Sequence, residues 1–486
     1  MKLSSANAFG VTVLVVTLAW MPLVDRQDIV KLAALAACVV LWSVGAAVVR
    51  VAGPRDLRAV LPSTRSSREG MVLLVLALVA MVIPGSRAGF EGWAALWLTA
   101  VAVWLASAPG WEPRPLVRWL VLAAALQAAL ALVGELWDPL QLSEWVPFRG
   151  RRALGTFGNP TLLGIWLAAA LPLCFVRPER VAGHPTGTGM KGWLAALLVV
   201  AGTLACRSRV AIGLLVIGAL AMVSIRAPRL RIGCVLAGLS ATGLGWALGY
   251  GDAAWNERWS VVKAVIEGMS DRGYLGWLTG IGAEGFANHW PLWRQRQDSL
   301  RTLALRHAHN DPLEWTVDYG LLGAGLFVAL VALAGKGLRS HADIQRLAGL
   351  SLGLLLIGGL MQPTLVGVPG AIFAGAMVAV VLFPSPTAHP RGYTAAALGL
   401  AAALLLGFMV LRCTSEWQRG RATILRVQGR DSLEAALAAA RIDASNDRAW
   451  LEVAMARDAE EAIRRVALEK VRVKGLSRAR SSPDEP

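Results

Sequence analysis

The chain has 486 residues, of which 56% are hydrophobic and 16% are charged, and its formal net charge is +16. Such an apolar excess excludes an ordinary soluble domain and predicts a membrane protein with several spans. We predict no nucleic-acid partner, because Lys and Arg concentrated in the cytoplasmic loops of a membrane protein explain most of the positive charge. The five Cys residues form no Cys-x-x-Cys motif, so neither a disulfide framework nor a zinc site is predicted.

Apolar runs, each close to the length that crosses a bilayer, follow one another along most of the chain. Thirteen are predicted, at 8–25, 29–50, 70–86, 91–108, 115–136, 160–177, 190–206, 209–226, 230–250, 312–335, 344–362, 367–384 and 393–412. The short turn at 362–367 is consistent with a re-entrant bend, so we expect twelve or thirteen spans. The predicted fold class is all-α, a polytopic transmembrane helical bundle over residues 1–412 with a large loop at 251–311 and a helical tail at 413–486.

Basic residues in the short loops set the predicted orientation of the bundle. Arg and Lys gather at 50–69, 226–231 and 336–346, and an inside N-terminus places all three loops in the cytoplasm. With thirteen spans, the 251–311 loop and the 413–486 tail then lie on the outer side of the membrane.

The 251–311 loop begins with an amphipathic segment that predicts a helix lying on the membrane surface. Its apolar residues recur at helical spacing, at Trp255, Trp259, Val262, Ile266 and Met269. Arg258 falls at the edge of this stripe and is predicted to reach the level of the lipid headgroups. Farther along the loop, Trp290 and Trp293 are either interfacial anchors or platforms on which sugar rings stack.

A Gly-rich turn, Thr279-Gly-Ile-Gly-Ala-Glu-Gly285, follows the amphipathic helix. Its glycines partly match a dinucleotide-binding pattern. No strand precedes them, however, and this excludes a nucleotide-binding fold.

A helix is predicted to begin where the loop ends. Asp311 suits the N-cap, Pro312 suits the first helical position, and Glu314 completes the capping pattern. His309 and Asn310 then precede a helix N-terminus, whose unpaired N–H groups and positive dipole favour an anion. The same field opposes protonation of an imidazole, so we predict a neutral His309 that can accept a proton, or, on the plainer interpretation, a polar cap without chemistry.

Two other features near the membrane edge leave alternatives open. Arg207 and Arg209 stand between apolar runs, where they either bind lipid headgroups or form a socket for a phosphate ligand. His307 and His309 lie two residues apart without a Cys cluster or a His-Glu-x-x-His motif, and such a pair is a weak signal for a metal. No metal and no other cofactor is therefore predicted.

The tail at 413–486 has its own helical pattern. Asp431-Ser-Leu-Glu434 resembles a capping box before a helix at 435–442, and Asn446 is placed to cap a second helix through Val473. Two such antiparallel helices resemble one tetratricopeptide unit, which rarely stabilises itself alone. We therefore expect the tail to dock on a partner, on the membrane or on the rest of the chain through the apolar residues Leu433, Leu437, Trp450 and Val453.

Several segments together resemble the bacterial O-antigen ligase and O-antigen polymerase superfamily. His307-Ala-His-Asn-Asp311 with Tyr319-Gly-Leu-Leu-Gly323 is similar to the His-Asn motif of that superfamily and to its downstream Gly-hydrophobic-hydrophobic-Gly. The other similar segments are Arg258-Trp259 with Thr279-Gly-Ile-Gly282 and Phe286, then Gly155-Thr-Phe-Gly-Asn-Pro160, and the Ser208-Arg209 pair. The resemblance is best over residues 150–330, whereas a thirteenth span and a soluble tail depart from the usual twelve-span plan.

The resemblance implies transfer of a glycan from an undecaprenyl-pyrophosphate carrier to an acceptor hydroxyl, at the periplasmic face of the bacterial inner membrane. The implied acceptor is lipid A-core, a polysaccharide or a protein. His309 would then be the general base, and Arg209 and Arg258 would bind the donor pyrophosphate. Supporting roles fall to His307, Asn310, Asp311 and Glu314.

The outer loops contain no Asp-x-Asp sequence, which favours a metal-independent reaction with arginines in place of a divalent cation. A polymerase of O-antigen or exopolysaccharide, or a protein O-glycosyltransferase of the same superfamily, would use the same donor chemistry with another acceptor. A small-anion transporter is the alternative that is not an enzyme. It would need paired broken helices and charge near the middle of the bilayer, whereas the polar residues here gather at the outer face.

Overall fold

The computed structural model describes residues 5–19, 113–136, 155–176, 190–230, 252–382 and 414–468, with short gaps inside these ranges, and five residues between 31 and 38. Within these ranges the secondary structure is helical, and no strand occurs. The chain forms two compact units, one of Met1–Leu18 with Trp42–Leu398 and the other of Ala19–Leu41 with Gly399–Pro486. The all-α class predicted from the sequence is confirmed for the described residues.

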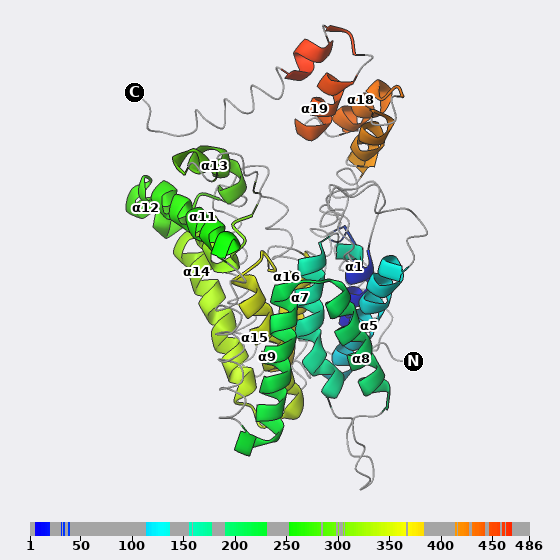
Figure 1. Cartoon of the computed structure of the whole chain (residues 1–486), viewed down its shortest axis with the longest axis vertical. Helices are drawn as coiled ribbons and strands as arrows, with labels where there is room; N and C mark the ends of the chain where they lie inside the picture. The colour runs from blue at the N-terminus through cyan, green and yellow to red at the C-terminus, as the bar shows by residue number, and fades with distance from the viewer. Residues whose placement is uncertain are drawn as a thin grey trace, which may run out of the picture. The chain divides into compact units, whose positions relative to one another are not determined.

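Helices occupy the predicted apolar runs wherever the structure describes them (Figure 1). Those of the first unit's bundle are α1 (Ser5–Leu18), α5 (Pro113–Leu136), α7 (Pro160–Ala170) with the 3-10 turn η3 (Leu171–Phe175), α8 (Met190–Ala205), α9 (Arg209–Arg226), α14 (Asp311–Leu338), α15 (Asp343–Gly359) and α16 (Val368–Leu382). The predicted spans at 70–86, 91–108, 230–250 and 393–412, and most of 29–50, lie outside the described residues.

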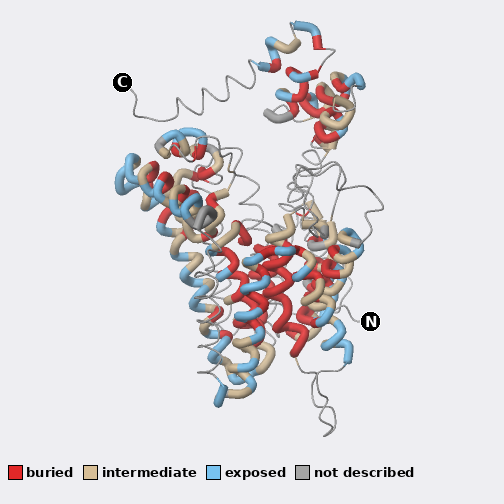
Figure 2. The backbone as a smooth tube through the Cα atoms, in the orientation of Figure 1, coloured by how far each residue is buried: buried red, intermediate tan, exposed pale blue. Residues whose placement is uncertain are grey.

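The centre of the bundle is a contact between α7, α15 and α16, where Figure 2 shows many buried residues. Trp166 of α7 is fully buried there, donates from Nε1 to the carbonyl of Pro369 at 3.2 Å, and packs against Phe373 at 5.4 Å between ring centroids. Small residues bring the helices together, since an added Cβ on Gly349 of α15 would collide with the backbone of Gly337 of α14.

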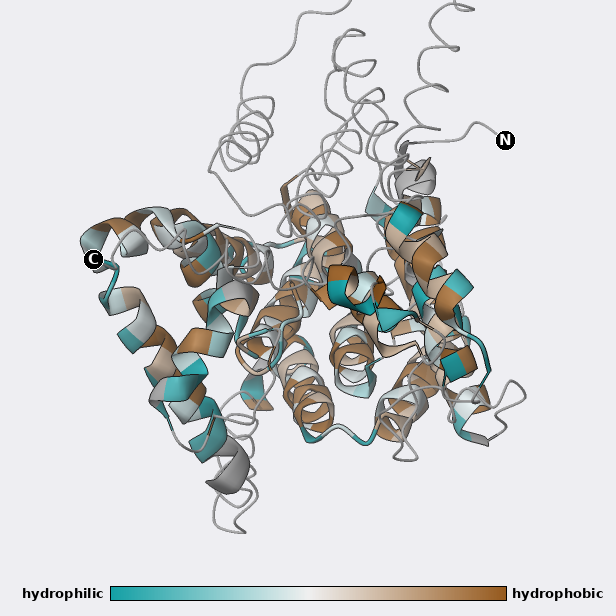
Figure 3. Ribbon diagram, turned by 90° about the horizontal axis from the view of Figure 1, so that it is seen from above, coloured by the Kyte–Doolittle hydropathy of each residue, from teal (hydrophilic) through white to brown (hydrophobic). Residues whose placement is uncertain are grey.

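Three described helices are long and apolar enough to cross a membrane, Pro113–Glu135, Arg209–Arg226 and Asp311–Leu338. The shorter apolar helices are Pro160–Phe175, Met190–Ala205 and Pro369–Leu382. Figure 3 shows apolar residues recurring along the helices that it draws. These observations point to a membrane protein, whereas the count of twelve or thirteen spans stays a prediction.

The helices α9 and α15 run antiparallel. An added Cβ on Gly358 of α15 would contact Leu214 of α9 at 3.3 Å, and one on Gly218 of α9 would contact Leu354 of α15 at 3.0 Å. The residue number therefore rises along α9 as it falls along α15. It follows that Arg209, the first residue of α9, lies at the same end of the bundle as the turn that follows α15.

The long helix α14 breaks at Gly320, whose φ is +61° and ψ is −144°. In an unbroken helix the carbonyls of Val317 and Asp318 would accept the N–H groups of Leu321 and Leu322. They instead accept the N–H groups of Ile281 at 2.9 Å and Gly282 at 3.0 Å. The Gly-rich turn of the 251–311 loop thus satisfies the carbonyls that the break makes available, as a broken membrane helix requires.

This junction explains the glycines of both motifs. Gly280 and Gly282 also have positive φ, +73° and +89°, which a glycine adopts at little cost. An added Cβ on Gly280 would collide with the Asp318 carbonyl, one on Gly320 with the Leu278 carbonyl, and one on Gly323 with the Trp315 carbonyl.

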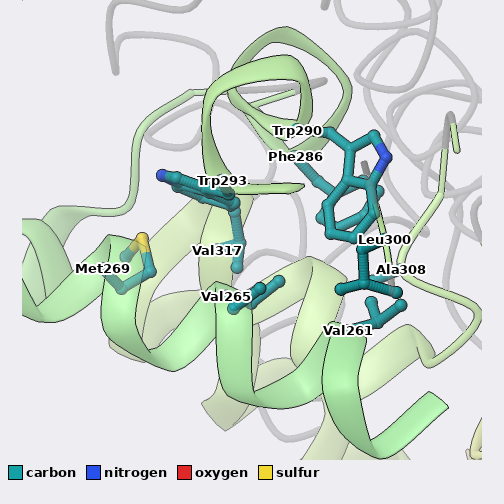
Figure 4. Close-up of a cluster of buried hydrophobic side chains, with 10 residues drawn as sticks. Val261, Val265, Met269, Phe286, Trp290, Trp293, Leu300, Ala308 and Val317 are labelled. Atoms are coloured by element: carbon teal, nitrogen blue, oxygen red, sulfur yellow. The ribbon is translucent and has the colours of Figure 1, made fainter. Parts of the chain in front are cut away.

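The 251–311 loop folds into a small helical subdomain with its own core. Its helices are α11 (Asp252–Ser270), α12 (Gly273–Thr279) and α13 (Gly285–Trp293), followed by the 3-10 turn η5 (Arg294–Arg296). Figure 4 shows the buried side chains that meet between them and α14, which are Val261, Ala264, Val265, Met269, Phe286, Trp290, Trp293, Leu300, Ala308 and Val317.

This core corrects two expectations drawn from the sequence. Met269, predicted to face the membrane, is fully buried in the loop core, whereas Trp259 of the same predicted stripe is 62% exposed. Trp290 and Trp293 are 1% and 3% exposed, and Phe286 stacks on Trp290 at 5.2 Å. Because their rings are enclosed by protein, they are not platforms for a sugar.

The second unit contains the tail helices α18 (Leu433–Ile442) and α19 (Asp447–Met455). Alanines form most of their contact, with Leu433, Leu437 and Trp450 packed around it. The buried carboxylate of Glu452 accepts from Thr423 at 2.9 Å and from Arg426 at 3.0 Å. The predicted first helix is confirmed, but the second ends at Met455, so the prediction of one helix through Val473 is wrong.

We predict that Gly320→Ala destabilises the first unit, because the added Cβ meets the Leu278 carbonyl in a backbone conformation that favours glycine. The expected loss in the free energy of unfolding is about 1–3 kcal/mol. Thermal unfolding of the detergent-solubilised protein, followed by Trp fluorescence, measures it as a lower Tm.

Gly325→Ala, in the same helix, is the matched control. An added Cβ there meets nothing within 4 Å, and Ala favours a helix over Gly, so Tm should stay or rise slightly. Equal Tm values for the two variants would show that the break in α14 contributes nothing to stability.

Candidate functional site

The site lies where the 251–311 loop enters α14. Asn310 is the N-cap of this helix, and its side-chain oxygen accepts from the N–H of Leu313 at 2.9 Å. Its amide nitrogen donates to the carbonyl of Leu360 at 3.1 Å, which links the cap to the end of α15. The predicted start of the helix is confirmed, but the cap is Asn310 and not Asp311, because the Asp311 carboxylate has another role.

Asp311 fixes the turn that follows α15. Its buried Oδ2 accepts from the N–H of Thr364 at 3.0 Å, the hydroxyl of Thr364 at 2.7 Å and the N–H of Leu365 at 2.9 Å. Gly359 allows this approach, since an added Cβ there would lie 2.5 Å from Oδ2. Together with the Asn310 contact, these bonds attach the turn at 360–365 to the start of α14.

His309 contacts the same turn. Its Nδ1 lies 3.1 Å from Oε1 of Gln362, which cannot donate a hydrogen bond, so Nδ1 carries the proton and Nε2 is the acceptor nitrogen. The φ of His309 is +54°, in the left-handed region that non-glycine residues seldom adopt. The surrounding contacts therefore hold the backbone in an uncommon conformation, as at many functional sites.

The pKa of His309 lies below its ordinary value of 6.5. Burial is the largest cause, because it disfavours the charged imidazolium, and the positive charge of Arg258 acts in the same direction. The hydrogen bond to Gln362 opposes this shift. The sequence predicted a neutral imidazole on account of the helix dipole, and the described surroundings favour the same neutral form mainly through burial.

His307 and Glu314 form a second contact within the segment. Nδ1 of His307 donates to Oε1 of Glu314 at 2.7 Å, and the N–H of Ala308 donates to Oε2 of Glu314 at 2.9 Å. Glu314 thus bridges the segment before the helix to the first turn of the helix. Through these contacts, His307 and Glu314 hold the segment that carries His309.

Arg258 reaches this site from α11. Its Nη1 lies 3.3 Å from Sδ of Met361, the neighbour of Gln362. Burial lowers the pKa of Arg258 from its ordinary value, although a guanidinium keeps its charge in a protein. The structure places Arg258 beside the turn at 360–365, where its charge acts on His309, and its predicted position at lipid headgroup level stays a prediction.

Arg209 belongs to the same end of the bundle but not to this set of contacts. It is exposed at the start of α9, after the N-cap Ser208, whose hydroxyl accepts from the N–H of Ala211 at 3.4 Å. The preceding Arg207 has a φ of +48° and pairs with Glu135 at 2.7 Å. Arg209 is exposed, so it remains a candidate to contact an anionic ligand.

The segment 155–160 is held by α5. Gln127 of α5 is fully buried and exchanges two hydrogen bonds with Thr156, at 2.7 Å and 3.3 Å. Asn159 then caps α7 by accepting from Thr161 at 2.9 Å and Leu162 at 3.3 Å. These contacts explain the polar residues of the segment as structural.

Sequence reasoning missed Gln362 and Thr364 as parts of the site. The available signal was the polar Gln-Pro-Thr stretch inside the predicted turn between two apolar runs. Of the seven predicted site residues, six lie in or beside the contacts around His309, and Arg209 lies at the same end of the bundle. Among the described residues, no group of three or more His, Cys, Asp or Glu side chains is placed to hold a metal ion.

Comparison of the sequence with protein-family models and with curated proteins gives no match.

Asp311→Ala should destabilise the first unit, because it leaves the N–H groups of Thr364 and Leu365 without their acceptor. Each buried donor left unsatisfied costs about 1–3 kcal/mol in the free energy of unfolding. We expect a lower Tm for the solubilised protein, measured by differential scanning fluorimetry.

Asp343→Ala is the control, since Asp343 also lies in the first turn of a helix and its buried Oδ2 has no hydrogen-bond partner among the described residues. This variant should change Tm little. A similar loss in both variants would contradict the role of Asp311 in holding the turn.

Proposed function

We propose that the chain transfers a glycan from an undecaprenyl-pyrophosphate carrier to an acceptor hydroxyl, at the periplasmic face of a bacterial inner membrane. The observation that carries this proposal is His309, a partly buried imidazole whose acceptor nitrogen is Nε2 and which lies within the field of Arg258. A neutral base beside a cation is the pair that glycosyl transfer from a pyrophosphate requires. The resemblance of the same residues to the O-antigen ligase superfamily supports it.

In the proposed reaction, Nε2 of His309 takes the proton of the acceptor hydroxyl as its oxygen attacks the anomeric carbon of the donor. The bond between that carbon and the pyrophosphate oxygen breaks, and undecaprenyl pyrophosphate leaves. The proton then passes from His309 to solvent or to the pyrophosphate. Gln362 supports this step, because its bond to Nδ1 keeps Nε2 as the basic nitrogen.

The leaving pyrophosphate needs positive charge. Arg258 lies at the site, and its planar guanidinium suits a bidentate contact with phosphate oxygens. Arg209 starts α9 at the same end of the bundle and is exposed to a ligand there. These two arginines would replace a divalent cation, and the metal-independent reaction stays a prediction.

The proposed acceptor is lipid A-core, a polysaccharide or a protein. The contacts around His309 and Arg258 are compatible with each of these acceptors. A ligase, a polymerase and a protein O-glycosyltransferase would share the base and the cation, since their donors share the pyrophosphate. The experiment that separates them supplies each acceptor class to the same purified protein with the same donor.

The break in α14 helps to decide between a transferase and the alternative function of a small-anion transporter. Transporters place unwound backbone groups against their ions. Here the carbonyls at the break accept hydrogen bonds from Ile281 and Gly282 of the chain itself, so they are not offered to an ion. Among the described helices, α14 alone shows such an internal break, which does not match a paired arrangement. We therefore favour the transferase.

The proposed orientation follows the basic loops at 50–69, 226–231 and 336–346, which the positive-inside rule assigns to the cytoplasm. His309 lies at the opposite end of α14 from Lys336, and so faces the periplasm. With thirteen spans the tail at 413–486 is also periplasmic, where we propose that it recruits the acceptor or a partner protein.

His309→Ala should lower the rate of transfer by about 10²–10⁴-fold, the usual contribution of a general base. The assay follows release of undecaprenyl pyrophosphate by the protein in proteoliposomes that contain a lipid-pyrophosphate glycan and an acceptor. His307→Ala should lose less, because the role of His307 is to hold the segment through its bond to Glu314. Near-normal transfer by the His309→Ala variant, with donor binding intact, would reject the assignment.

The charge of Arg258 should appear in the pH dependence of transfer. The base acts only when deprotonated, so the rate falls as the pH falls through the pKa of His309, which lies below its ordinary value. Arg258→Ala removes a positive charge that lowers this pKa, so the acid limb should move to higher pH while the rate drops. Arg258→Lys keeps the charge and loses the bidentate fork, so the rate should drop with less movement of the limb.

Arg209→Ala is the control for this shift, since Arg209 is not among the groups that act on the pKa of His309. It should lower the rate and weaken donor binding without moving the acid limb. An acid limb unchanged by Arg258→Ala would show that Arg258 and His309 do not act together.

A further inference from the structure

A second polar site lies at the other end of α14 from His309. It is a pocket of about 340 Å³ where the end of α14, the start of α15 and the end of α16 meet. Its lining consists of Ala332, Lys336, Gly337, Arg339, Ser340, Gln345 and Val381. From Asp311 to Lys336 the helix rises by roughly 40 Å, so this pocket is separate from the proposed catalytic site.

The polar floor of the pocket is built from groups that satisfy one another. The hydroxyl of Ser340 donates to Oε1 of Gln345, and Nε2 of Gln345 donates to the carbonyl of Val381 at 3.3 Å. Arg346 donates to the carbonyls of Ser340 at 3.2 Å and His341 at 3.3 Å, which closes the turn. The floor is thus fixed before any ligand arrives.

Close helix packing sets the depth of the pocket. An added Cβ on Gly337 would lie 2.8 Å from Cα of Gly349 and 2.9 Å from the carbonyl of Gln345. The end of α14 therefore lies directly against α15, and the side chains of Lys336 and Arg339 flank the hollow.

Two cations remain at this pocket without a described counter-charge. Lys336 and Arg339 are exposed, and neither forms an ion pair with a described residue. The lining contains no Asp or Glu, and Asp343, the acid nearest in sequence, is not part of it. An anion would thus meet two positive charges with no carboxylate in the wall.

The remaining wall is apolar. Ala332 is one α-helical turn before Lys336, and Val381 is near the end of the apolar helix α16. A pocket with cations on one side and hydrocarbon on the other suits a ligand with a phosphate and an acyl chain, whereas a free phosphate would use only the cations.

We propose that this pocket binds the phosphate of an anionic phospholipid headgroup. It lies at the end of a helix that is long and apolar enough to cross a membrane, at the level where headgroups meet such helices. Basic pockets between membrane helices recognise lipid phosphates in this way. The bound lipid would join the ends of α14, α15 and α16 and raise the stability of the unit, because it binds only the folded state.

Native mass spectrometry of the full chain released from detergent tests the proposal, with phosphatidylglycerol and phosphatidylcholine of the same acyl chains as probes. The unmodified protein should retain phosphatidylglycerol in preference to phosphatidylcholine. The double variant Lys336→Gln with Arg339→Gln should bind phosphatidylglycerol roughly thirtyfold more weakly, because each cation near a lipid phosphate contributes about fivefold. Added phosphatidylglycerol should raise the Tm of the unmodified protein more than that of the variant.

The matched control is the double variant Lys191→Gln with Arg229→Gln. Lys191 is the second residue of α8 and Arg229 follows α9, so both exposed cations lie at the same end of the α8–α9 hairpin but outside the pocket. This control variant loses the same charge as the pocket variant, and it should bind phosphatidylglycerol as tightly as the unmodified protein does. If the Lys336→Gln, Arg339→Gln double variant proves unstable, the single variant Lys336→Gln replaces it, with a smaller expected loss of phosphatidylglycerol binding.

Three results would overturn the proposal. Equal weakening in the control would show that total surface charge, not the pocket, holds the lipid. Unchanged binding in the Lys336 and Arg339 variants would place the lipid elsewhere. Displacement of the lipid by millimolar inorganic phosphate, with equal binding of phosphatidylcholine, would assign the pocket to free phosphate.

Discussion

The candidate site depends on one buried carboxylate. Oδ2 of Asp311 holds the turn at 360–365 through the N–H groups of Thr364 and Leu365 and the hydroxyl of Thr364. That turn brings Gln362 to His309 and Met361 to Arg258, so residues 53 and 103 positions apart share one site. Without this acceptor, the turn would lose three hydrogen bonds that hold Gln362 and Met361 in these positions. The orientation of the imidazole is therefore a consequence of how α14 begins.

The helix α14 acts as the platform for both parts of the site. Its first turn receives the loop after α15, and its break at Gly320 receives the Gly-rich turn of the 251–311 loop. The first junction pairs the short side chains of Asn310 and Asp311 mainly with backbone groups of the turn, and the second pairs backbone groups with each other, so neither requires a long polar side chain inside the bundle. The loop subdomain adds its own aromatic core, and α11 presents Arg258 from it.

The sequence predicted the helices well where the apolar runs are long, as at 115–136, 209–226 and 312–335, because a run of that length is typical of a membrane-spanning helix. It also identified six of the residues that meet around His309. It failed where tertiary contacts decide. Asp311 and Asn310 are equally good caps locally, and only a turn fifty residues away shows that Asp311 is used elsewhere. An amphipathic helix with two apolar faces, such as α11, also gives no local sign of which face meets protein, as Met269 shows.

The central claim is that Gln362 makes Nε2 of His309 the basic nitrogen. Nitrogen-15 NMR of the protein with labelled histidine, compared with the His309→Gln variant for assignment, measures the tautomer directly. We expect the neutral form with the proton on Nδ1, and a mixture of tautomers after Gln362→Ala. A proton on Nε2 in the unmodified protein, or an imidazole that remains charged above its ordinary pKa, would contradict the account.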